Sequence, residues 1–186
     1  MYWLSKSNFM MGKGQDFALQ AFAQVHETLP NWKLRLVGGD MGLKKNRDYI
    51  AKLKREAKRL NMERKIEWIA FTEDVELEYK QADIVLNFSE SESFSITCLE
   101  ALYFGRPLIA TDCGGPAEII DDDETGLLVP NRKVDAMAKA MLQLALDQNN
   151  RERMGAKARD VVKEKFSVEK TSFRLKEIYE QVLKQK

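Results

Sequence analysis

The sequence is poor in the residues that build metal sites and disulfide frameworks. It has two cysteines, Cys98 and Cys113, and one histidine among 186 residues. Neither cysteine belongs to a CxxC pair. This set predicts no metal centre and no disulfide framework, and it favours a reducing cytosol as the setting of the protein.

Long apolar runs and an excess of one charge are also missing. The apolar runs, such as residues 84–86 and 127–129, are far shorter than the ~20 residues of a membrane-spanning helix. No basic segment followed by an apolar run suggests an export signal. Lys and Arg number 30 against 29 Asp and Glu, so global charge indicates no partner. The glycine-rich loops lack interleaved aromatic residues, so no nucleic-acid surface is expected.

What the sequence does contain is an alternation of short apolar runs with longer amphipathic ones. This alternation is typical of a parallel sheet wrapped by helices, and 186 residues fit one domain. We expect strands at residues 1–6, 33–37, 66–69, 84–88, 107–110 and 126–129. We expect helices at residues 15–29, 44–60, 73–80, 96–104, 116–120, 134–146, 151–165 and 168–184.

Such a pattern predicts a doubly wound, Rossmann-like α/β sheet of about six parallel strands followed by C-terminal helices. In the common strand order 3-2-1-4-5-6, the winding reverses between strands one and four, and ligands bind outside the carboxyl ends there. The loops of residues 7–14 and 89–95 are therefore expected to converge on one site.

The first of these loops carries Gly12, Lys13 and Gly14 directly before a helix. Glycines allow a close approach of the backbone, and free N–H groups at a helix start favour an anion, so the loop suits a diphosphate. It lacks the third glycine of GxGxxG and the spacing of GxxxxGK[ST]. Taken alone, a glycine-bearing turn with an exposed lysine is the simpler interpretation.

The second loop is polar and acidic, although it follows the most apolar strand. The N–H groups of Ser95, Ile96 and Thr97 at the next helix start are candidate phosphate donors. Glu92 and Glu100 suit the paired hydroxyls of a sugar or ribose. A structural interpretation carries about the same weight as this binding role: Glu100 could close a capping box with Thr97, and Glu90 and Glu92 could be solvated loop charges.

At these residues the sequence resembles the E-x7-E signature of the retaining glycosyltransferases of family 4, also called group 1. Residues 91–101 carry the signature, and five further segments match in the same order. They are the KGxD-like residues 13–16, the strand and glycine turn of residues 36–39, and residues 105–112, 114–120 and 125–129.

The resemblance implies a donor site for a nucleoside diphosphate sugar. Glu92 would contact hydroxyls of the transferred hexose near the reacting carbon, and Glu100 would hold the ribose. Lys13 would bind the diphosphate, and no metal or other cofactor is expected. The implied donor-binding set is Lys13, Gly12, Gly14, Asn8, Gly38, Phe71, Thr72, Ser93, Phe94, Ser95, Ile96 and Glu100, with Phe71 and Thr72 beside the base.

Two positions depart from the family pattern. Asn8 stands where the family usually has an arginine as a second diphosphate contact. Lys6, two residues upstream, is a candidate substitute, although the resemblance does not assign it that role. Ser95 stands where a glycine often follows the phenylalanine of the first-acid loop, which bears on how closely the sugar approaches the backbone.

In the family, a catalytic unit has two Rossmann-like domains, and the resemblance covers only the second. We therefore expect residues 1–186 to be the donor domain, with the acceptor-binding domain outside this chain. The expected activity is hexosyl transfer with retention to a sugar or lipid-linked acceptor, in polysaccharide or glycoconjugate synthesis. The expected location is the cytoplasm, with peripheral contact at the inner membrane face left open.

The alternative is a non-catalytic nucleotide-binding module or regulatory subunit, which Asn8 favours. The chain alone is expected to bind donor without useful transfer.

Overall fold

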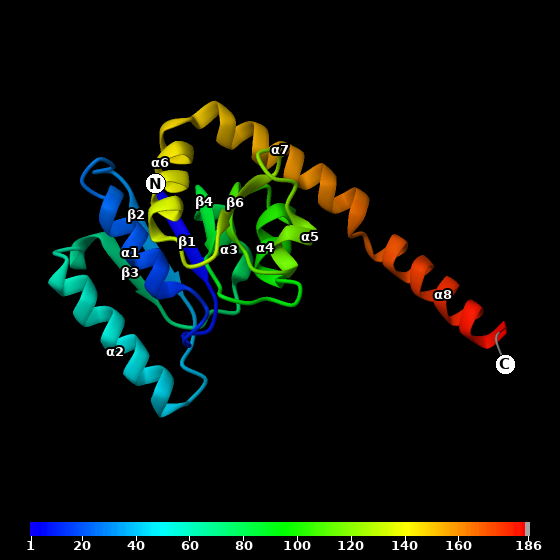
Figure 1. The fold of residues 1–186 in the computed structure, drawn as a ribbon, viewed down its shortest axis with the longest axis horizontal. Coiled ribbons are helices and arrows are strands. Elements are labelled where there is room, and N and C mark those ends of the chain that lie inside the picture. Colours follow the sequence, from blue (N-terminus) through cyan, green and yellow to red (C-terminus); the bar gives the residue numbers. More distant parts are fainter. Residues whose placement is uncertain (185–186) are drawn as a thin grey trace.

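A computed structural model describes residues 1–184. Six strands and eight α-helices alternate along this part of the chain, as Figure 1 shows. The strands are β1 (Tyr2–Lys6), β2 (Lys33–Val37), β3 (Ile66–Ile69), β4 (Ile84–Asn87), β5 (Leu108–Asp112) and β6 (Gly126–Pro130). The helices are α1 (Gln15–Val25), α2 (Lys44–Arg59), α3 (Val75–Gln81), α4 (Ile96–Tyr103), α5 (Gly115–Ile119), α6 (Val134–Leu146), α7 (Gln148–Lys165) and α8 (Val168–Lys184).

The six strands form one parallel sheet in the order β3-β2-β1-β4-β5-β6. β1 lies between β2 and β4, with Tyr2 opposite Lys33 on one side and Trp3 opposite Ile84 on the other. The predicted doubly wound order is confirmed, and the winding reverses between β1 and β4 as expected.

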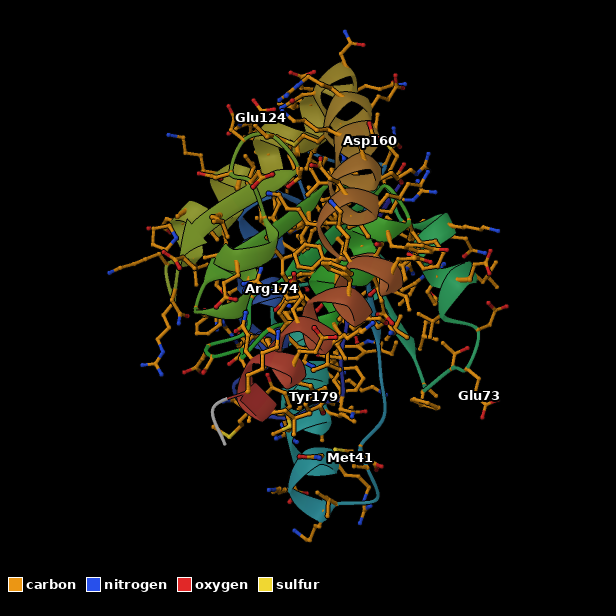
Figure 2. The ribbon with its side chains drawn as sticks, turned by 90° about the vertical axis from the view of Figure 1, so that its right-hand side faces the viewer. Met41, Glu73, Glu124, Asp160, Arg174 and Tyr179 are labelled. Carbon is orange, nitrogen blue, oxygen red and sulfur yellow. The ribbon has the colours of Figure 1, made fainter. Side chains whose placement is uncertain are left out.

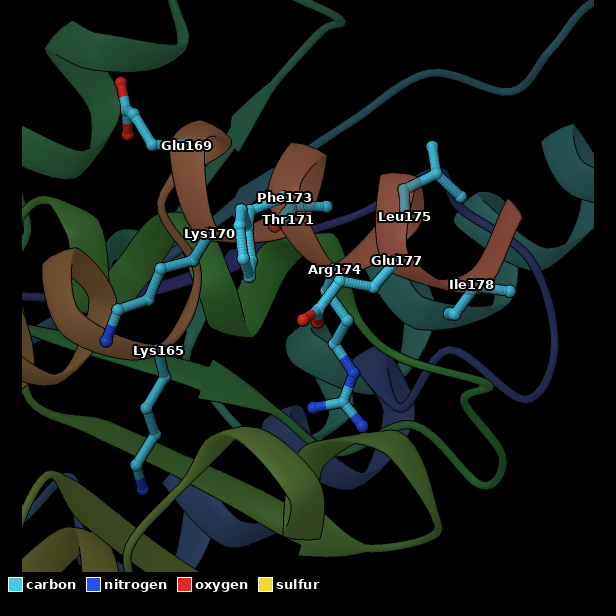
Figure 3. Close-up of a pocket in the computed structure, with 9 residues that line it drawn as sticks. All are labelled: Lys165, Glu169, Lys170, Thr171, Phe173, Arg174, Leu175, Glu177 and Ile178. Carbon is cyan, nitrogen blue, oxygen red and sulfur yellow. The ribbon is translucent and has the colours of Figure 1, made fainter. Parts of the chain in front are cut away.

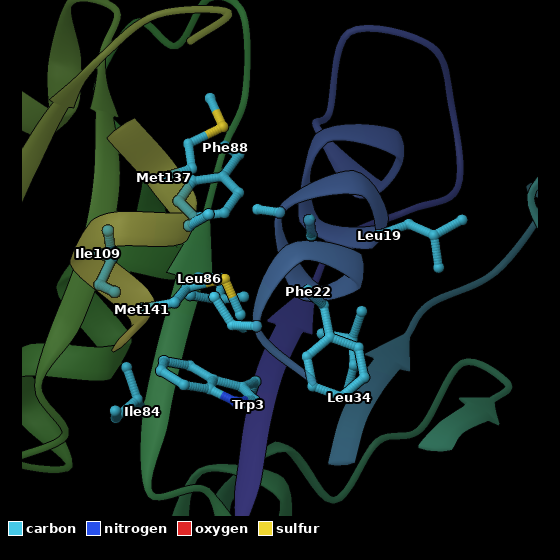
Figure 4. Close-up of a cluster of buried hydrophobic side chains, with 14 of the residues drawn as sticks. Trp3, Leu19, Phe22, Leu34, Ile84, Leu86, Phe88, Ile109, Met137 and Met141 are labelled. Atoms are coloured by element: carbon cyan, nitrogen blue, oxygen red, sulfur yellow. The ribbon is translucent and has the colours of Figure 1, made fainter. Parts of the chain in front are cut away.

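Two apolar layers cover the two faces of the sheet. The larger core joins α1, α2 and α6 to one face, around Trp3, Phe22, Leu86 and Met141 (Figure 4). The smaller core joins α3, α4, α5 and α7 to the other face. All four residues of β4 are buried, because this strand is covered by helices on both sides.

The predicted element bounds differ from the structure mainly at helix ends. α1 ends at Val25 rather than at residue 29, although Leu29 still bonds to Val25 O at 3.0 Å and is buried. α7 begins at Gln148, three residues earlier than predicted, because the Asp147 side chain caps it by accepting from Asn150 N at 2.9 Å. The short 3₁₀ helix Glu63–Lys65 was not predicted.

Helix α8 differs from the rest of the fold, because it projects away from the body formed by the sheet and its two helical layers (Figure 1). None of its side chains is buried, and Figure 2 labels Arg174 and Tyr179 along it. Within residues 1–184, no helix combines the length and apolarity that crossing a bilayer requires.

Candidate functional site

The loops after β1 and β4 meet at the carboxyl ends of the two strands. The N–H of Glu90 donates to Gly12 O at 2.8 Å, which ties the two loops together. Gly14, at φ +77°, precedes α1 and leaves no room for a side chain, since a Cβ there would overlap the carbonyl of Phe88. The convergence expected from the strand order is confirmed.

Lys13 and Glu92 form an ion pair across these loops. Lys13 Nζ lies 2.9 Å from Glu92 Oε1, and Ser89 Oγ donates to the same oxygen at 2.8 Å. The other carboxylate oxygen of Glu92 has no hydrogen-bond partner among the described residues. The lysine is therefore not the isolated surface cation that the loop alone suggested.

The backbone around Glu92 rests on a pair of glycines after β5. Gly115 N donates to Glu92 O at 2.8 Å, and Glu92 forms an isolated bridge with Gly114. A Cβ on Gly115 would overlap the backbone of Phe94. The glycine-containing segment of residues 114–120 thus positions the acidic loop.

Glu100 lies on α4 and binds two side chains from other elements. Lys6 Nζ and Tyr79 Oη each lie 2.9 Å from Glu100 Oε2. Burial, and next the negative charge of Glu100, raise the pKa of Tyr79 above its ordinary value, so its hydroxyl stays protonated and donates. The capping box between Thr97 and Glu100 is not formed.

Ser95 caps α4 in place of Thr97. Its φ is +80°, and its hydroxyl accepts from Cys98 N at 3.4 Å. Thr97 Oγ1 instead donates to Lys6 O at 3.3 Å. Burial raises the pKa of the neighbouring Cys98 thiol to about 12, so this cysteine remains a neutral packing residue. In the described part of the chain, no acceptor pairs with the N–H of Ile96 or Thr97.

Two adjoining hollows lie at this end of the sheet and share Ser7, Ile96 and Thr97. The first hollow, about 470 Å³, is also lined by Lys6, Asn8, Val37, Gly38, Phe71, Thr72, Glu73, Val75 and Glu100. The second hollow, about 350 Å³, is also lined by Lys13, Glu92, Ser93, Phe94 and Ser95.

The structure brings together the residues that the sequence singled out. Of the thirteen candidates, eleven line one of these hollows, while Gly12 and Gly14 line neither and shape the loop that carries Lys13. Figure 2 shows Met41 and Glu73, from the segments after β2 and β3, toward the opposite end of the body from Glu124 and Asp160.

Sequence reasoning missed Tyr79 and Ser89, and it considered Lys6 only as a substitute for the missing arginine, whereas the structure pairs Lys6 with Glu100. Tyr79 donates to Glu100, and Ser89 donates to Glu92. Tyr79 belongs to a segment that the sequence predicts only as a short helix, and Ser89 belongs to one that it predicts only as a polar loop. Only Lys6 could have been found from the sequence, through the alternation of side chains along a strand. Alternate residues of β1 face opposite sides of the sheet, so Lys6 points to the same side as Leu4, where Glu100 also lies.

A larger hollow of about 910 Å³ runs along α8 (Figure 3). It is lined by nine residues that all come from residues 165–178, at the end of α7 and on α8. Because α8 buries no side chain, this hollow is an exposed helix face rather than a place where elements converge.

Fold and site together define a doubly wound α/β domain with two adjoining hollows at its switch point. Residues 2–161 match the model of the family described as glycosyl transferases group 1. The chain therefore belongs to the group 1 glycosyl transferases, as the signature around Glu92 and Glu100 indicated.

The chain is similar to individual curated and solved proteins. The N-acetyl-alpha-D-glucosaminyl L-malate synthase of Bacillus anthracis is 32% identical over 178 residues, which cover 96% of this chain and 45% of that enzyme. HepE of Anabaena, solved in complex with UDP, superposes with a TM-score of 0.90 at 23% identity, covering 97% of this chain and 48% of HepE.

A third relative consists of a single domain. The C-terminal domain of a group 1 family glycosyl transferase from Francisella tularensis, LpcC, superposes with a TM-score of 0.82 at 26% identity. The match covers 90% of this chain and 86% of that domain. This chain thus spans about half the length of the longer relatives and nearly all of the solved C-terminal domain.

Proposed function

We propose that this chain is the donor-binding domain of a retaining glycosyltransferase that moves a hexosyl unit from a nucleoside diphosphate sugar to a sugar or lipid-linked acceptor. The observation that carries the proposal is the pair of adjoining hollows at the switch point. One contains Glu100, and the other contains the Lys13–Glu92 pair. Their volumes, about 470 and 350 Å³, suit the two ends of such a ligand.

The first hollow would take the nucleoside. Glu100 would accept hydrogen bonds from the ribose hydroxyls, because a carboxylate oxygen accepts more than one hydrogen bond. Phe71 is 69% exposed at the rim and, with Thr72, would flank the base. Gly38 lines the same hollow, and it must be a glycine because a Cβ there would overlap the carbonyl of Ser7.

The diphosphate would lie between the hollows. Lys13 would exchange its contact with Glu92 for a phosphate oxygen, and Asn8 would donate one uncharged hydrogen bond. Ser95 and Ile96 lie at the start of α4, where free N–H groups and the helix dipole favour an anion. These donors would offset the leaving-group charge, so the proposal requires no metal.

The hexose would occupy the second hollow, with Ser93 and Phe94 on its wall and Glu92 against its hydroxyls. In transfer, the acceptor oxygen forms a bond to the anomeric carbon on the face that the diphosphate leaves. The electron pair of the broken carbon–oxygen bond goes to the β-phosphate oxygen, which also takes the acceptor proton. Glu92 would orient the donor, and Lys13 would stabilise the departing charge.

The relatives support a sugar donor of this kind. HepE was solved with UDP and also with UDP-glucose, and the Bacillus anthracis enzyme is named for a glucosaminyl product. Since this chain spans about half of each of these proteins, we propose that the acceptor is bound by a further domain. Transfer would then need closure of both domains, and the chain alone would bind donor with no useful turnover.

Calorimetric titration of Glu92→Gln tests the proposal. We expect UDP to bind the variant at least as well as the wild type, because Lys13 is released. We expect UDP-glucose to lose roughly tenfold in affinity relative to UDP, since one hydrogen bond to a charged acceptor is lost. The same titrations with GDP-mannose and GDP, and with ADP-glucose and ADP, test donors that carry guanine or adenine in place of uracil.

An unchanged ratio of sugar to diphosphate affinity would place the hexose away from Glu92. When the domain is joined to an acceptor-binding domain, the same variant should lose turnover, whereas robust transfer by the isolated chain would contradict the need for a second domain.

One observation favours a second candidate, a non-catalytic nucleotide-binding module. Asn8 is exposed on the wall of the first hollow and brings no charge to the diphosphate. A module would bind nucleoside diphosphates without preferring their sugar esters, and Glu92→Gln would change the affinities for UDP and UDP-glucose by the same factor. The titrations above therefore separate the two candidates.

A further inference from the structure

The two oxygens of the Glu100 carboxylate have different surroundings. Oε2 accepts from Lys6 Nζ and from Tyr79 Oη, each at 2.9 Å. Oε1 has no hydrogen-bond partner within residues 1–184. Since each carboxylate oxygen has about two lone-pair sites, the protein fills those of Oε2 and leaves those of Oε1 for a ligand.

Tyr79 is held rigidly in the position from which its hydroxyl donates to Oε2 of Glu100. Its side chain is fully buried, and its ring stacks on Phe104 with 5.2 Å between the ring centroids and 13° between the planes. Its hydroxyl also lies 3.3 Å from Thr97 O. A buried and stacked ring has one available orientation, so the Tyr79 hydroxyl fixes where Oε2 can lie.

Lys6 contributes charge to the same arrangement. It comes from the end of β1, and its ammonium group lies 5.5 Å from the centre of the Tyr79 ring. Only 21% of its side chain is exposed, and it lines the first hollow together with Glu100. The protein itself therefore supplies the Glu100 carboxylate with a counter-ion.

We propose that Tyr79 and Lys6 are positioning residues that select a ribose-containing ligand. They hold Oε2 of Glu100 so that Oε1 accepts from the ribose diol. This inference rests on the proposed function, because it requires a nucleotide in the first hollow. It goes further by making the hollow specific for ribose over 2'-deoxyribose.

A purely structural role is the competing explanation, in which the hydrogen bond only ties α3 to α4. That role would change stability and would lower the affinity for every nucleotide equally. Discrimination between UDP and dUDP is the readout that separates the two, because these ligands share the base and the diphosphate and differ by one hydroxyl.

The experiment is calorimetric titration of the chain with UDP and dUDP, and in parallel with GDP and dGDP. Loss of a hydrogen bond to a charged acceptor corresponds to roughly tenfold or more in affinity, so we expect the wild type to prefer the ribonucleotide by about that factor. Tyr79→Phe keeps the stacked ring and should reduce the preference to about threefold or less. Lys6→Met should reduce it in the same direction.

The matched control is Tyr49→Phe. Tyr49 is likewise a buried tyrosine whose hydroxyl has a backbone partner, Asp16 N at 3.3 Å, but it lies on α2 and lines neither hollow. It should lower the melting temperature as Tyr79→Phe does and leave the ribose preference unchanged. If Tyr79→Phe fails to fold, Lys6→Met carries the test.

The outcomes distinguish this inference from the proposed function. A wild type that binds no nucleoside diphosphate overturns both. A wild type that binds UDP or GDP without preferring ribose overturns this inference alone. A ribose preference that Glu100→Gln abolishes but Tyr79→Phe and Lys6→Met leave intact also overturns it, because Glu100 would then need no support.

Discussion

The two acids of the cleft have similar hydrogen bonds but different supports. Glu92 and Glu100 each place one oxygen between a lysine and a hydroxyl group, from Lys13 and Ser89 in one case and from Lys6 and Tyr79 in the other. Glu92 belongs to an irregular loop, whereas Glu100 lies within α4.

This difference determines which substitutions disturb each acid. The loop of Glu92 is located by backbone contacts, with Gly115 N bonded to Glu92 O and with no space for a Cβ on Gly115. The orientation of Glu100 depends on side chains that reach α4 from β1 and α3. A methyl group added at Gly115 should therefore displace Glu92. Loss of the Tyr79 hydroxyl should instead change the orientation of Glu100.

Gly115→Ala is expected to have the largest effect. The new methyl group would overlap the backbone of Phe94, so the Glu92 loop must shift, and overpacking of this kind costs about 3 kcal/mol. Urea unfolding measures the loss of stability, and titration with UDP-glucose measures the accompanying loss of affinity.

Gly39→Ala is the matched control for this substitution. The nearest atom to its Cβ would be Phe71 Cβ at 3.4 Å, an ordinary contact, and its φ is not positive. Its stability should change by less than about 1 kcal/mol. Equal stabilities for the two variants would show that backbone packing does not locate the loop acid.

Lys13→Met should have the next largest effect. Removal of the cation should weaken UDP binding about tenfold and leave the binding of uridine nearly unchanged, because Lys13 lines only the second hollow. Isothermal titration with UDP and with uridine measures the two losses of affinity.

Lys33→Met is the control, because it removes a lysine that is paired with Glu67 at 3.0 Å and lies outside both hollows. A comparable loss of uridine affinity in Lys13→Met would mean that the two halves of the cleft are not separable.

Asn8→Arg should have the smallest effect, and in the opposite direction. A guanidinium group at this exposed position on the first hollow should strengthen UDP binding about threefold, as expected for a solvent-exposed charge pair of about 0.5–1 kcal/mol. The gain should shrink as salt concentration rises.

Met11→Arg adds the same charge to the same loop, at a residue that is exposed and lines neither hollow. If both arginine variants bind UDP equally, the gain reflects overall charge rather than a contact at position 8.

Much of the fold was predictable because it depends on local pattern. The runs of residues 84–86 and 127–129 marked buried strands, and the spacing of apolar residues marked the helices on either face. Helix ends were less predictable, since the start of α7 depends on one hydrogen bond that Asn150 N donates to the Asp147 side chain. A pattern of apolar residues carries little information about such a cap.

The candidate site was predictable in part for a related reason. Gly12, Lys13, Glu92 and Glu100 stand in short motifs beside strand ends, and strand order places those ends together. The partners of the acids are not in those motifs. Lys6 lies 94 positions from Glu100 along the chain, and Tyr79 lies 21 positions from it.

The sequence by itself determined the order of strands and helices, the switch point between β1 and β4, and the family of the chain, because periodicity and contiguous motifs are local properties. Only the tertiary structure decided that Glu100 pairs with Lys6 and Tyr79 instead of closing a capping box with Thr97. A carboxylate can accept from several donors, and the donor it finds depends on which segments folding brings within hydrogen-bonding distance.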